Sequence, residues 1–169
     1  GRDCRWNNRY APSASPENAG AAANLVRALI AVGENREASE VIKDALKKDP
    51  ENPSLLNTLA GVLRKLKQYD AAAAAARKVI LRDQKNAAAI KNLALIYADQ
   101  GKFQLAETFF KNALKLDAKD ADIHVNLGLI EFRRGNHQAA IVEFEKALEL
   151  NPKNAVAMAN IGAIRLQFR

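Results

Sequence analysis

Side chains that could perform catalysis or bind a metal are few in this sequence. It has one cysteine, Cys4, and two histidines, His124 and His137, which fall in different predicted helices. It has no Gly-rich phosphate-binding loop, no Ser-His-Asp order and no Cys/His group at metal-ligand spacing. Glu143 and Glu145 point to different sides of one helix, so they make a poor acid/base pair. The sequence predicts no catalytic site, no metal site, no cofactor, and structural roles for both histidines.

Side chains that could bind a peptide backbone recur at a fixed interval. Five residues of the helix N-cap type stand 34 residues apart, each before an apolar run of helical period: Asn18, Asn52, Asn86, Asp120 and Asn154. Six residues past them lie Asn24, Thr58, Asn92, Asn126 and Asn160. Because a side-chain amide offers a donor and an acceptor, such a row can pair with an extended peptide. The alternative, that these amides bond neighbouring helix backbone, stays open.

The elements that carry this row repeat with it. Seven residues past the caps lie large apolar residues expected in the core: Leu25, Leu59, Leu93, Leu127 and Ile161. Glycines that can end a helix in the left-handed conformation follow in three units, at Gly33, Gly101 and Gly135, while Lys67 takes that place in the second unit. Small residues twenty past the caps would let a second helix approach closely. Each unit is therefore predicted to be a helix, a turn and a second helix.

These features resemble the tetratricopeptide repeat. Beside the 34-residue spacing and the turn glycines, the residues that carry the resemblance are Leu127, Gly128, Ala140, Phe144, Ala147 and Pro152. The resemblance implies an all-α solenoid with a right-handed superhelix and four full repeats, 19–52, 53–86, 87–120 and 121–154, plus one extra helix at 155–169. Residues 1–18, in which arginines alternate with Trp6 and Tyr10, are expected to be a flexible N-terminal leader.

The resemblance also indicates where a ligand would bind. One face of each first helix has no partner within its own repeat, and in this family that face lines a concave peptide-binding groove. The groove residues predicted here are Asn24, Arg27, Asn57, Arg64, Lys65, Lys91, Asn92, Leu95, Val125, Asn126, Leu129, Phe132 and Asn160. The N-terminal half of this set is mostly basic. The C-terminal half is mostly apolar and continues through Val156 and Leu166, which predicts an exposed apolar row.

The overall charge and hydropathy limit the partners. Lys and Arg number 26 against 19 acidic residues, a net charge of +7, which favours acidic partners. No stretch approaches the ~20 apolar residues of a membrane span, so we expect a soluble protein of the cytoplasm or periplasm. Because the chain starts with Gly1 rather than Met, we expect that an upstream part has been removed.

The sequence thus predicts a non-catalytic protein–protein interaction scaffold that binds a partner peptide or helix in the groove and assembles a complex. The expected ligand is a protein segment with hydrophobic and acidic residues, rather than nucleic acid. The alternative is a structural component that forms homo-oligomers through the array ends or the convex face, for example in a bacterial envelope, pilus, motility or secretion machine. The last helix favours this alternative, because its core-side residues Met158 and Ile161 lack a covering second helix.

Overall fold

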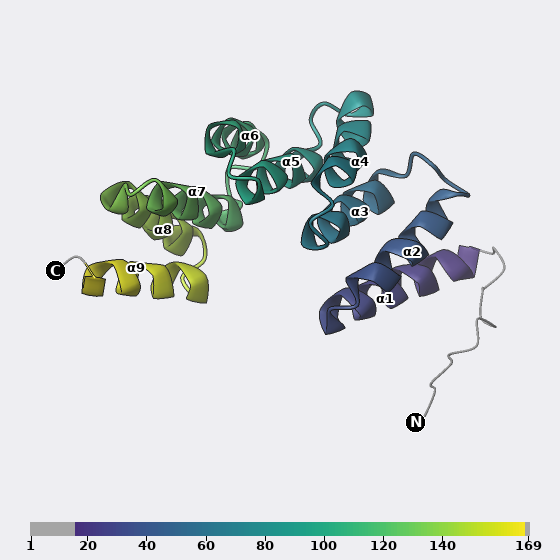
Figure 1. The fold of residues 1–169 in the computed structure, drawn as a ribbon, viewed down its shortest axis with the longest axis horizontal. Helices are drawn as coiled ribbons and strands as arrows, with labels where there is room; N and C mark the ends of the chain where they lie inside the picture. The colour runs from purple at the N-terminus through teal and green to yellow at the C-terminus, as the bar shows by residue number, and fades with distance from the viewer. Residues whose placement is uncertain (1–15, 168–169) are drawn as a thin grey trace, which may run out of the picture.

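The computed structural model of the chain describes the backbone of residues 16–167 and the side chains of residues 22–167. Every regular element in that range is an α-helix, and the bounds are α1 Pro16–Val32, α2 Asn35–Leu46, α3 Pro53–Lys65, α4 Tyr69–Arg82, α5 Ala87–Asp99, α6 Phe103–Leu116, α7 Ala121–Arg133, α8 His137–Leu150 and α9 Ala155–Gln167. The helices follow one another as pairs along an elongated array, and α9 lies at the C-terminal end without a companion (Figure 1). The predicted all-α solenoid is confirmed. Cys4, Trp6 and Tyr10 lie outside the described residues.

The recurring Asn and Asp residues cap the first helix of four units. The side-chain oxygens of Asn52, Asn86 and Asn154 accept the backbone N–H three residues ahead, and that of Asp120 accepts the N–H two residues ahead. These bonds satisfy N–H groups that have no partner within the helix. Asn18 was predicted to cap the first unit, but α1 begins at Pro16, so Asn18 lies inside the helix. Proline suits the first helical position, since its fixed φ is already helical.

The turn between the two helices of a unit has a left-handed residue in every repeat. Gly33, Gly101 and Gly135 have φ of 86°, 74° and 82°, and Lys67 has φ of 59°. Glycine adopts this conformation freely, whereas a residue with a Cβ does so at a cost of roughly 1 kcal/mol. The turn predicted from the sequence is therefore present in all four units, including the one without glycine.

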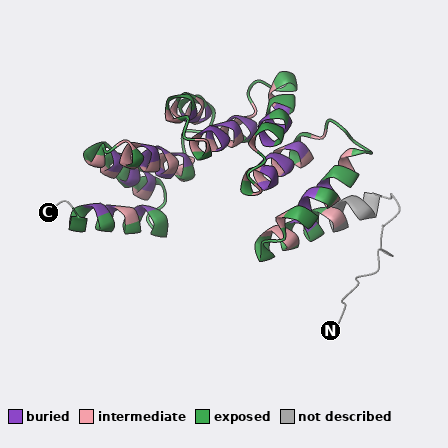
Figure 2. Ribbon diagram, in the orientation of Figure 1, coloured by how far each residue is buried: buried purple, intermediate pink, exposed green. Residues whose placement is uncertain are grey.

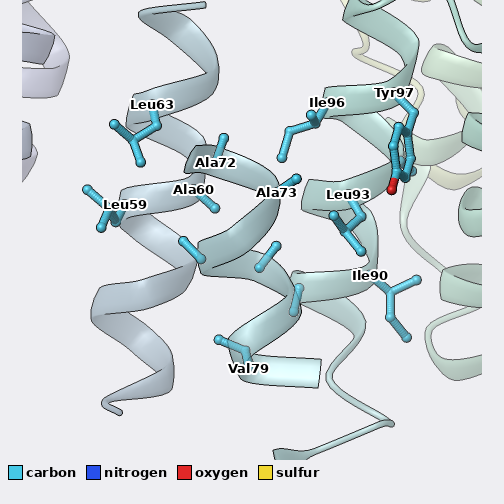
Figure 3. Packing of buried hydrophobic residues seen from close by; sticks show 14 of the residues in the cluster. Leu59, Ala60, Leu63, Ala72, Ala73, Val79, Ile90, Leu93, Ile96 and Tyr97 are labelled. Atoms are coloured by element: carbon cyan, nitrogen blue, oxygen red, sulfur yellow. The ribbon is translucent and has the colours of Figure 1, made fainter. Parts of the chain in front are cut away.

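The core forms where the second helix of each unit crosses the first. Residues twenty past the caps, Ala38, Ala72, Ala106 and Ala140, are 0% exposed, which lets the two helix backbones approach closely. One buried cluster extends from α1 to α7, and a second joins α7, α8 and α9. Figure 3 shows the first cluster where alanines of α4 lie between the leucines of α3 and the large apolar residues of α5. The buried residues lie between the helices rather than on their outer surfaces (Figure 2).

The two ends of the array depart from the predicted pattern. Leu25 was expected in the core, like Leu59 and its equivalents, but it is 49% exposed. In the later units the first helix also packs against the preceding second helix, and the described residues contain no such helix before α1. At the other end, Met158 is 49% exposed because no described helix follows α9, while Ile161 is buried against the second cluster.

Candidate functional site

The first helices form a continuous wall, because α3 contacts α5 and α5 contacts α7. A hollow of about 310 Å³ lies along this wall and extends to the start of α9. We call it the central hollow. Its lining residues are Arg64, Lys91, Leu95, Asp122, Val125, Asn126, Asn154 and Val156. Five of the predicted site residues thus lie around one space, and the other eight are not among its lining residues.

The apolar side chains of this wall are less exposed than the sequence predicts. Val125 is only 7% exposed, because it packs in the second core cluster with residues of α8 and α9. Leu95, Leu129 and Phe132 are half-buried against the two clusters. Val156, by contrast, is 51% exposed at the edge of the hollow. The expected exposed apolar row is therefore present in part: Val156 and Leu166 are exposed, whereas Val125 is buried. The hollow has an apolar lining of Leu95 and Val125 beside the exposed Val156.

The cations at the central hollow already have carboxylate partners. Arg64 Nη1 lies 2.8 Å from Asp99 Oδ2, and Lys91 Nζ lies 2.6 Å from Asp120 Oδ2. Both pairs are partly buried, with 24% and 29% of the cationic side chains exposed. Because each pair neutralises a charge, the basic half of the predicted groove offers an acidic ligand less attraction than its residue types suggest.

The remaining predicted cations, Arg27 and Lys65, are not among the lining residues of the hollow. Arg27 Nη2 donates to Asn24 Oδ1 at 2.5 Å on the exposed surface of α1. Lys65, at the end of α3, is exposed and makes no hydrogen bond or ion pair with any residue that the structure describes. Of the predicted cations, only Arg64 and Lys91 are thus among the lining residues of the hollow.

Several polar groups of the wall bond the next repeat, a role that the sequence reasoning missed. Asn57 Nδ2 donates to Asn86 Oδ1 at 3.2 Å, and Lys91 bonds Asp120 in the same way one repeat later. In each case a residue five past one cap bonds the following cap, 29 residues ahead. Because the spacing of 29 residues is visible in the sequence, it could have indicated both bonds. It could also have indicated that the caps Asp120 and Asn154 lie near the site.

The repeated asparagines bond helix backbone with their amide nitrogens. Asn92 Nδ2 donates to the carbonyl of Asn57 at 3.0 Å and so joins α5 to α3. Asn126 and Asn160 donate to carbonyls four residues back in their own helices, at 2.7 and 2.8 Å. The alternative left open by the sequence is therefore confirmed for these three donors. Their side-chain oxygens accept no hydrogen bond from a described residue, so each keeps an acceptor for a ligand.

The histidines serve the packing of the last full unit. His124 Nδ1 lies 2.8 Å from Glu143 Oε2, between α7 and α8, and the His137 ring lies 5.4 Å from that of Phe132. Burial raises the pKa of the Glu143 carboxyl, but hydrogen bonds from His124 and Lys146 outweigh that effect and hold the pKa below its usual value. Among the residues that the structure describes, no group of three His, Cys, Asp or Glu side chains could hold a metal ion.

None of the helices in the described part of the chain has both the length and the hydropathy that a membrane span requires.

A tetratricopeptide repeat model matches residues 23–89 and 91–155. The chain is similar to the crystal structure of MamA, with 25% identity, coverage of 84% of this chain and 83% of that chain, and a TM-score of 0.67. It is also similar to a thermophilic protein of this repeat class from Thermus thermophilus, with 21% identity, coverage of 88% and 81%, and a TM-score of 0.78.

A third similar structure, YrrB, is described as having an unusual peptide-binding site; it shows 23% identity, coverage of 83% and 73%, and a TM-score of 0.66. No match was found among curated proteins.

Proposed function

We propose, because the chain belongs to the tetratricopeptide repeat family, that it is a non-catalytic scaffold that binds a segment of a partner protein along its first helices and assembles a complex. The observation that carries this proposal is the central hollow. It combines apolar side chains from three helices with polar groups that keep free hydrogen-bonding capacity. Peptide sites in proteins use this combination, since apolar contacts supply affinity and a few polar groups fix orientation.

Bonds between repeats join the helices that carry the lining residues of the hollow. Asn92 joins α5 to α3, and Lys91 joins α5 to the cap of α7, so the lining residues are held by bonds between repeats. A site whose side chains are already fixed loses less conformational entropy when a ligand binds. YrrB, a structure of the same fold, is described as peptide-binding, which supports a peptide ligand for this chain as well.

Affinity capture from the native source tests this proposal with two matched variants. Val156→Asn removes an exposed apolar side chain at the hollow, and Leu81→Asn removes one that is 83% exposed on the second helix α4. Both replace an apolar residue with the same uncharged one. We expect the wild type and the Leu81 variant to retain the same partner, and the Val156 variant to lose most of it. Equal retention by all three proteins would contradict binding at the first helices.

A second candidate function is self-assembly through the C-terminal end of the array. Met158 and Leu166 of α9 are 49% and 74% exposed, and a Cβ added at Gly162 would meet nothing within 4 Å. In the preceding unit the equivalent place, Gly128, is covered by a second helix. The open face of α9 could therefore pack against another copy of the chain.

Light scattering over a range of protein concentrations distinguishes this candidate from the first. Self-assembly predicts a mass that rises with concentration and returns to that of the monomer in Met158→Lys. Ile161→Lys is a poor variant for this purpose, because Ile161 is buried and its loss would disturb the fold. A monomer at every concentration would contradict self-assembly and leave the binding of a separate partner intact.

A further inference from the structure

We propose that the central hollow selects an extended peptide segment in which an apolar side chain stands next to a Lys or Arg side chain. This inference rests on the proposed function and specifies the ligand. It reverses the charge of the ligand expected from the sequence, because the structure shows which charges of the site are already paired and which one is not.

The unpaired charge of the hollow is a carboxylate. The ionised groups at the hollow and their direct partners comprise two cations, Arg64 and Lys91, and three carboxylates, Asp99, Asp120 and Asp122. Asp99 and Asp120 pair with the two cations. The Asp122 carboxylate makes no ion pair or hydrogen bond with any residue that the structure describes. A ligand that places a cation beside Asp122 therefore gains an attraction, whereas an anion there meets a net negative site.

Two asparagines that line the hollow with Asp122 can bind a backbone N–H and a backbone carbonyl of a peptide ligand. Asn126 uses its Nδ2 on the Asp122 carbonyl, so its Oδ1 is left to accept a backbone N–H of the ligand. Asn154 uses its Oδ1 to cap α9 at the N–H of Ala157, and its Nδ2 is left to donate to a ligand carbonyl. One acceptor and one donor in the lining of the same hollow suit an extended chain, whose backbone groups are not bonded to each other.

The apolar side chain of the ligand has a place next to the cation. Leu95 and Val125 contribute apolar atoms from neighbouring helices, and Val156 stands at the edge, half-exposed. At about 310 Å³, the hollow is at the small end of the ~300–1,000 Å³ range of ligand pockets. A hollow of this size suits a short peptide segment better than a whole helix.

Selection from a phage-displayed library of random dodecamers on the immobilised full chain tests the proposal. Asp122→Asn removes the unpaired carboxylate. Asp70→Asn is the matched control, because Asp70 is likewise the second residue of its helix, α4. The Asp70 carboxylate also makes no hydrogen bond or ion pair with a described residue. Both variants lose the same favourable interaction of an acidic side chain with a helix N-terminus.

The expected result is enrichment of peptides with Lys or Arg beside an apolar residue. Their affinity, measured by fluorescence anisotropy, should fall about two- to five-fold in Asp122→Asn, as for exposed ion pairs, and stay unchanged in Asp70→Asn. Enrichment of Asp or Glu, or equal effects of the two variants, would overturn the inference and leave the proposed function standing. If no peptide is enriched, or if Val156→Asn leaves the affinity of every selected peptide unchanged, both the inference and the proposed function are contradicted.

Discussion

Gly128 and Phe144 make the tightest contact among the glycine positions of the described core. A Cβ built on Gly128 would lie 2.7 Å from Cε1 and 2.8 Å from Cδ1 of the Phe144 ring. Phe144 is 0% exposed, so its ring has no free space into which to move. The small residue eight places past the cap thus sets how closely α8 approaches α7.

Gly128→Ala is therefore expected to destabilise the protein. Inserting a methyl group into a well-packed core costs typically about 1 to 3 kcal/mol. The third repeat carries Ala94 and Phe110 at the corresponding places, which shows that the array tolerates the methyl group when the helices are spaced for it. The midpoint of urea unfolding, followed by circular dichroism, measures the change.

Gly162 provides the control at the same repeat position. Nothing lies within 4 Å of a Cβ added there, and Gly162 is exposed in the interior of α9. Because alanine favours a helix over glycine by up to about 1 kcal/mol, Gly162→Ala should be neutral or stabilising. A loss of stability as large as that of Gly128→Ala would show that the glycine is not required by the ring of Phe144.

Between α6 and α7, a partly buried polar network joins the helices in addition to apolar contacts. Glu107 of α6 bonds Lys111 at 2.6 Å in its own helix and Arg134 at 2.9 Å just after α7. Arg134 also bonds Glu131 at 2.7 Å. The hydrogen bonds from Lys111 and then Arg134 hold the pKa of the Glu107 carboxyl below its usual value.

A lowered pKa makes this junction sensitive to acid. The folded protein holds the Glu107 proton less tightly than the unfolded chain, whose Glu titrates near ~4.3. This carboxylate therefore adds stability above the unfolded pKa, and the contribution is lost as pH falls through the folded pKa. We expect Glu107→Gln to be less stable than the wild type at neutral pH, with the difference shrinking in acid. Denaturation at several pH values should show this convergence, and a stability difference that stays constant in acid would contradict the role of Glu107.

The period of the sequence predicted the elements well, because it records local chemistry. N-cap residues, the left-handed turn and the small residues at helix crossings each act within a few residues of their own position, so four of the five caps and all four turns were predicted at the right places. The burial of Val125 and the exposure of Leu25 were not predicted. Both depend on whether another repeat lies beside the helix, and a repeated pattern treats the ends of the array and its middle alike.

Part of the lining of the candidate site could also be predicted from the repeated pattern. Five of its lining residues follow from which face of the first helix lacks a partner. The charge of the site does not follow from that face, because the carboxylates that pair with its cations lie elsewhere. Asp99 is at the end of one first helix, and Asp120 is the cap of the next. These pairs join successive repeats, 29 or 35 residues apart, so an argument from the faces of single helices does not reveal them.

In the molecule as a whole, the proposed binding site lies on one side of the array. The first helices α3, α5 and α7, with the start of α9, form the hollow, whereas the second helices α4, α6 and α8 form the outer layer and the core crossings. A ligand in the hollow should therefore rigidify a set of helices that alternate along the chain.

Hydrogen–deuterium exchange of the chain with and without its captured partner tests where the ligand binds. We expect exchange to slow in α5, α7 and the first turn of α9, and to change little in α4 and α6. Slower exchange confined to the second helices would contradict binding in the central hollow, because it would place the partner on the opposite side of the array.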